Sequence, residues 1–255
     1  MTVRRTSAPP RDAVHHPVFA RFYARFSTRL DTRAGVADHR RELLAGLSGR
    51  VIEIGAGNGL NFAHYPRAVS EVVAVEPEPV LRGLALEAAR RAGVPVDVVP
   101  GTAEALPVKS EAFDAAVVSL VLCSVRNVPR ALAELHRVLR PGGELRFFEH
   151  GPAASRGMAR VQRALDATVW PRLFGGCHTS RDTLAALDAA GFELGAYRRL
   201  TVPEGGERLP TSACVLGVAR RPFPAPGPEG RGAAPGGEPG TPGTAGTSGI
   251  PGAPG

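Results

Sequence analysis

The sequence predicts an α/β fold with a doubly wound, seven-stranded sheet that is mostly parallel, has an antiparallel closing strand and carries helices on both faces. A β-branched apolar run at residues 51–54 ends at Gly55, where a helical stretch begins, which is typical of a buried strand followed by a tight turn. Strand and helix patterns then alternate as far as residue 149, which indicates a covered parallel sheet. The 255 residues suffice for one domain of about 200 residues plus tails. Together these features predict a Rossmann-like architecture.

The first 50 residues predict a tail and two helices. Residues 1–14 are polar and contain prolines and arginines, so we expect a disordered tail there. Aromatic residues recur at three- and four-residue spacing over residues 18–26, with arginines between them, which predicts an amphipathic helix. Such a helix can pack on the core, form a lid over a pocket or adsorb to an anionic membrane surface, and the sequence leaves all three open. A second helix is expected at residues 36–47.

Six strands and four helices are expected after Gly55. The strands are expected at residues 71–76, 94–99, 113–120, 144–149, 192–200 and 213–219, and the last two form an antiparallel pair. The helices are expected at residues 79–92, 128–139, 155–173 and 180–190, with a break at Pro141-Gly142-Gly143 and Ser180 as an N-cap. Glycine and proline dominate residues 221–255, so we expect a disordered tail.

Composition excludes several classes of protein. The net charge is +7, but the basic residues other than Lys109 are all arginines, a skew typical of genomic base composition, so nucleic acid is not the expected partner. Three cysteines without a C-x-x-C pair argue against a disulfide scaffold or a zinc site and favour a reducing cytoplasm. The sequence has neither a signal peptide's apolar core nor the roughly 18 apolar residues that a membrane span requires.

The glycine turn predicts a binding site for a nucleoside that carries an ammonium group. Gly55, Gly57 and Gly59 allow close approach of a ligand to the backbone at the start of a helix. The third glycine comes one residue too early for the dinucleotide pattern, which disfavours a nicotinamide-dependent dehydrogenase. Glu53, two residues before the turn, suits a cationic group rather than a phosphate.

Two further strand ends extend this site. Glu76 follows the second strand, about twenty residues after the glycines, where a carboxylate can accept hydrogen bonds from a ribose diol. The turn at residues 101–107 follows the third strand and could hold a purine edge through its backbone or through Glu104. A plain helix-start role for Glu104 remains open.

The set of motifs resembles class I S-adenosylmethionine-dependent methyltransferases. It consists of Glu53-x-Gly55-x-Gly57-x-Gly59, Glu76, residues 101–107, Phe113-Asp114-Ala115 and residues 139–143. Residues 120–125, Phe148-Glu149-His150 and Gly176-Cys177-His178 narrow the resemblance to the methyltransferase-like 7, or thiol methyltransferase, branch. It implies a methyltransferase domain at residues 15–220, divided into a helical lid (15–48), a donor-binding core (49–150) and an acceptor side (151–220).

The resemblance also implies the donor-binding residues. S-adenosyl-L-methionine would contact Glu53, Gly55, Gly57, Gly59, Asn61, Glu76, Pro77, Thr102, Ala103, Glu104, Ser119 and Leu120. The glycines would line the methionine moiety and ribose, and Glu53 would lie near the ammonium. Glu76 would hold the ribose hydroxyls, and Pro77 would pack on adenine.

The sequence signals for the acceptor side of the site are less specific than those for the donor side. His150 and His178 are the candidate general bases, although a structural role is open for each, and Cys123 and Cys177 are expected to be small pocket-lining residues. No metal is expected. We expect an acceptor pocket with a mainly aromatic wall, which indicates a small apolar or amphiphilic acceptor. The residues of this wall are Phe19, Phe22, Tyr23, Trp170, Phe174 and His178. The alternatives are a non-catalytic donor-binding regulator and a nucleic-acid methyltransferase.

Overall fold

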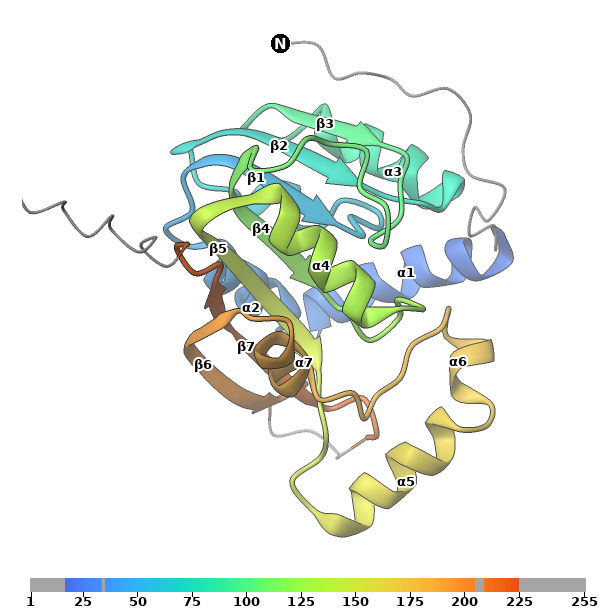
Figure 1. Cartoon of the computed structure of the whole chain (residues 1–255). Helices are drawn as coiled ribbons and strands as arrows, with labels where there is room; N and C mark the ends of the chain where they lie inside the picture. The colour runs from blue at the N-terminus through green and yellow to red at the C-terminus, as the bar shows by residue number, and fades with distance from the viewer. Residues whose placement is uncertain (1–16, 34, 205–208, 225–255) are drawn as a thin grey trace, which may run out of the picture. The chain divides into compact units, whose positions relative to one another are not determined.

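The computed structural model describes residues 17–33, 35–204 and 209–224. Seven strands form one sheet in the order β3-β2-β1-β4-β5-β7-β6 (Figure 1). Their bounds are β1 (Gly49–Ile54), β2 (Val69–Val75), β3 (Val96–Val99), β4 (Phe113–Ser119), β5 (Leu139–His150), β6 (Glu193–Thr201) and β7 (Ala213–Arg220). Strands β1 to β5 pair in parallel, and β7 runs antiparallel to both β5 and β6. The predicted fold class is confirmed.

Helices cover both faces of the sheet (Figure 1). They are α1 (Pro17–Arg33), α2 (Val36–Leu44), the 3-10 turn η1 (Phe62–His64), α3 (Pro79–Ala89), α4 (Val128–Val138), α5 (Arg156–Asp166), α6 (Trp170–Leu173) and α7 (Thr183–Ala189). Most of the predicted tails at residues 1–14 and 221–255 lies outside the described residues.

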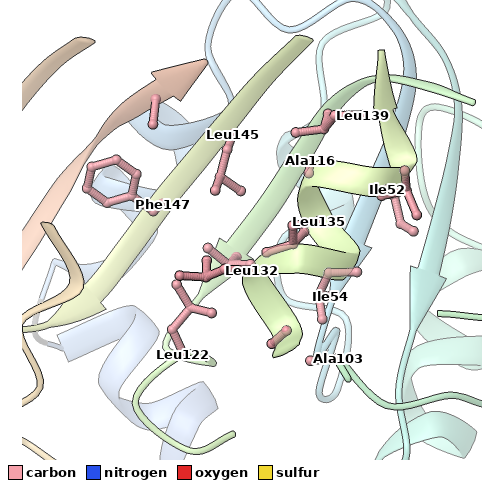
Figure 2. Packing of buried hydrophobic residues seen from close by; sticks show 14 of the residues in the cluster. Ile52, Ile54, Ala103, Ala116, Leu122, Leu132, Leu135, Leu139, Leu145 and Phe147 are labelled. Atoms are coloured by element: carbon pink, nitrogen blue, oxygen red, sulfur yellow. The ribbon is translucent and has the colours of Figure 1, made fainter. Parts of the chain in front are cut away.

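The two-residue repeat of the strands divides the core between the two faces. Ile52 and Ile54 of β1 point into the cluster beneath α4 and α7, and Figure 2 shows Leu132 and Leu135 of α4 packed against that face. Val51, on the other side of β1, belongs to the cluster that contains apolar side chains of α2 and α3. Because Glu53 lies two residues after Val51, its carboxylate is directed to the side of α2 and η1.

Several element ends differ from the sequence-based expectation. Strand β5 begins at Leu139 and runs through the predicted break, where Gly142 has φ 77°. The helix predicted at residues 155–173 is two helices, α5 and α6. Ser180 does not cap α7, because its hydroxyl donates to Asp166 Oδ2 (2.6 Å); Asp182 caps that helix by accepting the N–H of Ala185 (3.1 Å). A side-chain contact between distant segments thus overrides the local capping signal.

Candidate active site

The glycine turn lies at the carboxyl end of β1, between β2 and β4, where the strand order reverses. Ligands of doubly wound sheets bind at such a switch point. The backbone N–H groups of Gly55 and Ala56 both donate to the carbonyl of Val75, at 2.8 and 3.2 Å. The turn is therefore fixed to the end of β2, next to Glu76.

The three glycines of the turn all have positive φ, but they face different surroundings. A Cβ on Gly55 would lie 2.6 Å from Val121 Cγ2, and one on Gly59 would lie 2.7 Å from Ala88 Cβ. A Cβ on Gly57 would meet only the ring of Tyr23, at 3.7 Å. Gly55 and Gly59 are thus required for packing within the fold, whereas Gly57 borders the space between the turn and α1.

Glu76 is tied to the same turn. Its side chain is buried, and its oxygens accept the N–H of Gly57 (2.8 Å) and the N–H of Glu78 (2.9 Å). Burial raises the pKa of the Glu76 carboxyl, while these two hydrogen bonds act in the opposite direction. The carboxylate predicted to hold a ribose is therefore placed directly beside the glycine turn.

Glu53 lies in a buried polar network under the turn. Asn61 Nδ2 donates to one carboxylate oxygen (2.8 Å) and the hydroxyl of Tyr65 donates to the other (2.7 Å). Arg40 of α2 donates from Nη1 to Asn61 Oδ1 (2.8 Å) and to Ser119 Oγ (3.2 Å). Burial raises the pKa of Glu53 to about 7, partly offset by the two hydrogen bonds and by Arg40. Sequence reasoning missed Arg40, which lies outside every motif.

The turn at residues 101–107 lies against the end of β2. A Cβ on Gly101 would be 2.9 Å from both Val75 Cγ1 and Pro107 Cδ, so the turn packs tightly there. Glu104 Oε1 accepts the N–H groups of Arg126 (3.1 Å) and Asn127 (3.3 Å), immediately before α4. One oxygen of its carboxylate thus binds the backbone just before α4 (Val128–Val138), and Thr102 and Ala103 lie within the turn itself.

The end of β4 has an unusual backbone. Leu120 has φ 58°, which is uncommon for a residue other than glycine, and its N–H donates to the carbonyl of Phe148 (2.7 Å). The carboxylate of Glu149 accepts the next three N–H groups, those of residues 121 to 123, at 2.8, 2.9 and 3.3 Å. Burial raises the pKa of Glu149 to about 7, and these hydrogen bonds oppose the shift. Sequence reasoning gave Glu149 no role, because its partners lie on another strand's loop.

The fold brings one of the two predicted histidines together with two cysteines. Cys123, His150 and Cys177 each offer one potential ligand atom, and these atoms all lie within 4.8 Å of one another. Both cysteines are free and buried. The His178 N–H donates to the carbonyl of Cys123 (2.8 Å), which joins the loop after β4 to the loop after α6.

The predicted aromatic wall is present only in part. Tyr23 faces the glycine turn, and burial raises its pKa to about 12. Trp170 and Phe174 stack with their ring centroids 4.0 Å apart. Phe22 is instead 56% exposed and stacks on Phe26 at 5.8 Å, so it forms no buried wall. The side chain of Phe19 lies outside the described residues.

Comparison with known proteins identifies the family. Residues 52–147 match the model of a methyltransferase domain. The thiol S-methyltransferase TMT1A of Homo sapiens is 33% identical over 197 residues, which cover 72% of this chain and 79% of that protein. The chain belongs to the class I S-adenosylmethionine-dependent methyltransferases. Within this family of enzymes it is close to the TMT1 branch, and its methyl donor is S-adenosyl-L-methionine.

Other members of the methyltransferase family match less of the sequence or only the fold. The ubiquinone/menaquinone biosynthesis C-methyltransferase UbiE of Syntrophotalea carbinolica is 31% identical over 62% of this chain and 70% of its own length. A solved S-adenosylmethionine-dependent methyltransferase of Thermotoga maritima superimposes with a TM-score of 0.58, at 25% identity, over 80% of this chain and 98% of that one. No helix among the described residues is long and apolar enough to cross a bilayer.

Proposed function

We propose that this methyltransferase transfers the methyl group to the sulfur of a small apolar or amphiphilic thiol. The observation that carries the proposal is the 33% identity to a thiol S-methyltransferase over most of both chains. The aromatic side chains of Tyr23, Trp170 and Phe174 support an apolar acceptor, because flat apolar surfaces favour such ligands.

The proposed donor site uses the residues around the glycine turn. Gly57, with its open side, would lie against the methionine and ribose, and Glu76 would accept the ribose hydroxyls. Glu53 and Asn61 would support the ammonium end from beneath the turn. The remaining proposed contacts are Gly55, Gly59, Pro77, Thr102, Ala103, Glu104, Ser119 and Leu120. The sulfonium of the bound donor supplies an activated methyl group.

The protein's own task is then to align the acceptor, exclude water and remove the thiol proton. Thiolate, not thiol, is the nucleophile. Burial lowers the pKa of His150 to about 4, so its ring is neutral at neutral pH but a weak base toward a thiol whose ordinary pKa is about 8.5. His178, on the Gly-Gly-Cys-His loop, is therefore the candidate that we retain for the general base.

The test compares acceptors that differ in one atom. Benzenethiol, phenol and aniline would be incubated with labelled donor and the full chain, and we expect transfer to the thiol to exceed transfer to the other two at least tenfold. Glu76→Ala is the control that removes the proposed ribose clamp. Transfer to phenol or aniline without transfer to benzenethiol would refute the thiol proposal.

We also propose that the enzyme works in the cytoplasm, at anionic membrane surfaces. Its three cysteines are free, which fits a reducing compartment. Phe22 and Phe26 are exposed on α1 among the exposed arginines 21, 25 and 29, a combination that favours anionic lipid. Vesicles with anionic headgroups should sediment the protein and neutral vesicles should not. Equal sedimentation of wild type and a Phe22→Ser, Phe26→Ser double variant would refute this contact.

A further inference from the structure

Cys123, His150 and Cys177 form a cluster that the donor site does not use. They come from three separate segments: the loop after β4, the end of β5 and the break between α6 and α7. Because they lie far apart in the chain, their spacing shows no metal-binding pattern. In the fold, however, two sulfurs and an imidazole nitrogen lie within 4.8 Å of one another.

We propose that Cys123, His150 and Cys177 bind a soft divalent cation, zinc in the first place, and leave a fourth position open to the acceptor thiol. Two thiolates and one imidazole are a ligand set that zinc binds in catalytic sites, with a substrate or water as the fourth ligand. Tetrahedral zinc with bonds of 2.0–2.3 Å places its ligand atoms about 3.5–4 Å apart. The cluster therefore needs only a small contraction to enclose the ion.

The surroundings of the cluster hold its members in place, as the second shell of a metal site does. His150 Nδ1 lies 3.6 Å from Cys214 Sγ, and the backbone of Thr211 also hydrogen-bonds to the ring, so these contacts orient the imidazole. The carboxylate of Glu149 fixes the N–H of Cys123 (3.3 Å). The Cys177 N–H donates to the carbonyl of Phe174 (3.1 Å), so both cysteine loops are fixed.

The charges balance when zinc binds. The two cysteine protons leave to solvent, and two thiolates with a neutral imidazole then neutralise the divalent ion. An acceptor thiol that takes the fourth position gives up its proton to the proposed base, His178. Its sulfur lone pair then forms the new S–CH₃ bond while the donor's S–CH₃ bond breaks, and those electrons remain on the sulfur of S-adenosylhomocysteine. The product is a thioether, a weaker ligand than a thiolate, and it can dissociate.

The position of Tyr23 links the cluster to the donor site. Its phenol interacts electrostatically with Glu76 of the donor site and with Cys123 and Cys177 of the cluster. The same ring borders Gly57. A thiol bound at the cluster would thus lie on the side of the glycine turn where the donor is proposed to bind. This second half of the inference rests on the proposed function, whereas metal binding itself does not.

Cobalt(II) is the probe for the metal site, because thiolate-to-cobalt charge transfer and tetrahedral d–d absorption report the ligands directly. We expect the metal-stripped full chain to bind one equivalent with a tetrahedral, two-thiolate spectrum. Cys123→Ser and Cys177→Ser should each lose about half of the charge-transfer intensity and bind at least tenfold more weakly. Cys214→Ser removes the third buried cysteine and should retain the wild-type spectrum. Thermal unfolding of each variant establishes that it folds.

A wild-type protein without the tetrahedral spectrum would overturn the metal site, even if a variant failed to fold. So would unchanged spectra in folded Cys123→Ser and Cys177→Ser. Benzenethiol added to the cobalt form should increase the charge-transfer absorption as a third thiolate; no increase at a saturating concentration overturns the open fourth position. This readout needs no methyl transfer. If benzenethiol changes the cobalt spectrum but is not methylated, the proposed function is refuted while the proposed metal site is retained.

Discussion

Replacing Glu76 by alanine is expected to weaken binding of S-adenosylhomocysteine about 100-fold. The carboxylate is buried at the end of β2 and already accepts the N–H of Gly57 (2.8 Å) and of Glu78 (2.9 Å). These bonds orient it beside the glycine turn. A ribose diol would then add two hydrogen bonds to an ionised acceptor, and the substitution removes both.

The magnitude follows from the number and kind of these bonds. A hydrogen bond to a charged group contributes about 1.5–3 kcal/mol, so two such bonds contribute at least about 3 kcal/mol. Since about 1.4 kcal/mol corresponds to a tenfold change in affinity, the loss is about 100-fold. Glutamine retains one carbonyl acceptor in nearly the same place, so we expect Glu76→Gln to bind S-adenosylhomocysteine about tenfold more weakly than wild type. The N–H groups left unpaired should lower the free energy of unfolding by about 1–3 kcal/mol.

Calorimetric titration with S-adenosylhomocysteine measures this effect without an acceptor. Glu71→Ala is the matched control: Glu71 lies near the start of β2, makes an ion pair with Arg50 and is partly exposed, so the same charge is lost at the other end of the strand. The affinity of the Glu71→Ala protein for S-adenosylhomocysteine should equal that of wild type. A folded Glu76→Ala protein that binds within twofold of wild type would refute the ribose role of Glu76.

Three further predictions test other parts of the site. Because burial raises the pKa of Glu53 to about 7, the folded state keeps a proton on this carboxyl that the unfolded state releases above about pH 4.5. Between pH 4.5 and 7, urea unfolding should therefore show the stability of wild type falling by up to about 3 kcal/mol relative to that of Glu53→Gln, and parallel pH profiles of the two proteins would contradict the shift. Gly57→Ala and Gly59→Ala both place an L-residue at positive φ, but only Gly59→Ala adds the 2.7 Å contact with Ala88, so it should lower the unfolding midpoint further; equal midpoints would contradict the packing argument. Gly57→Ala should in addition weaken donor binding. Tyr23→Ala should lower kcat at least tenfold with less than threefold change in donor affinity, and unaltered turnover would exclude α1 as a lid.

The fold and the position of Glu76 beside the glycine turn were predictable because their signals are local. The strand at residues 51–54, the glycines after it and Glu76 lie in short stretches, and the parallel register of β1 and β2 brings their ends together without further information. The antiparallel pair of β6 and β7 was likewise readable from two apolar runs near the end of the domain.

The features that could not be predicted from the sequence depend on contacts between distant segments. Arg40 reaches Asn61 and Ser119 from a helix that has no motif of its own. Glu149 holds a loop that follows a different strand. The split between α5 and α6 accompanies the contact of Asp166 with the N–H of Ser180 (2.8 Å), which no local propensity reveals. Each of these features requires the tertiary fold before it can be recognised.

The left-handed backbone at Leu120 limits which residues are tolerated directly after β4. An L-residue at φ 58° is disfavoured by about 1–2 kcal/mol, and a β-branched valine or isoleucine there would suffer more. Glycine removes the steric conflict, but it adds freedom to the unfolded chain. Laboratory evolution of new acceptor preferences should therefore find few accepted replacements at this position, and diversity should accumulate on α1 and α6 instead.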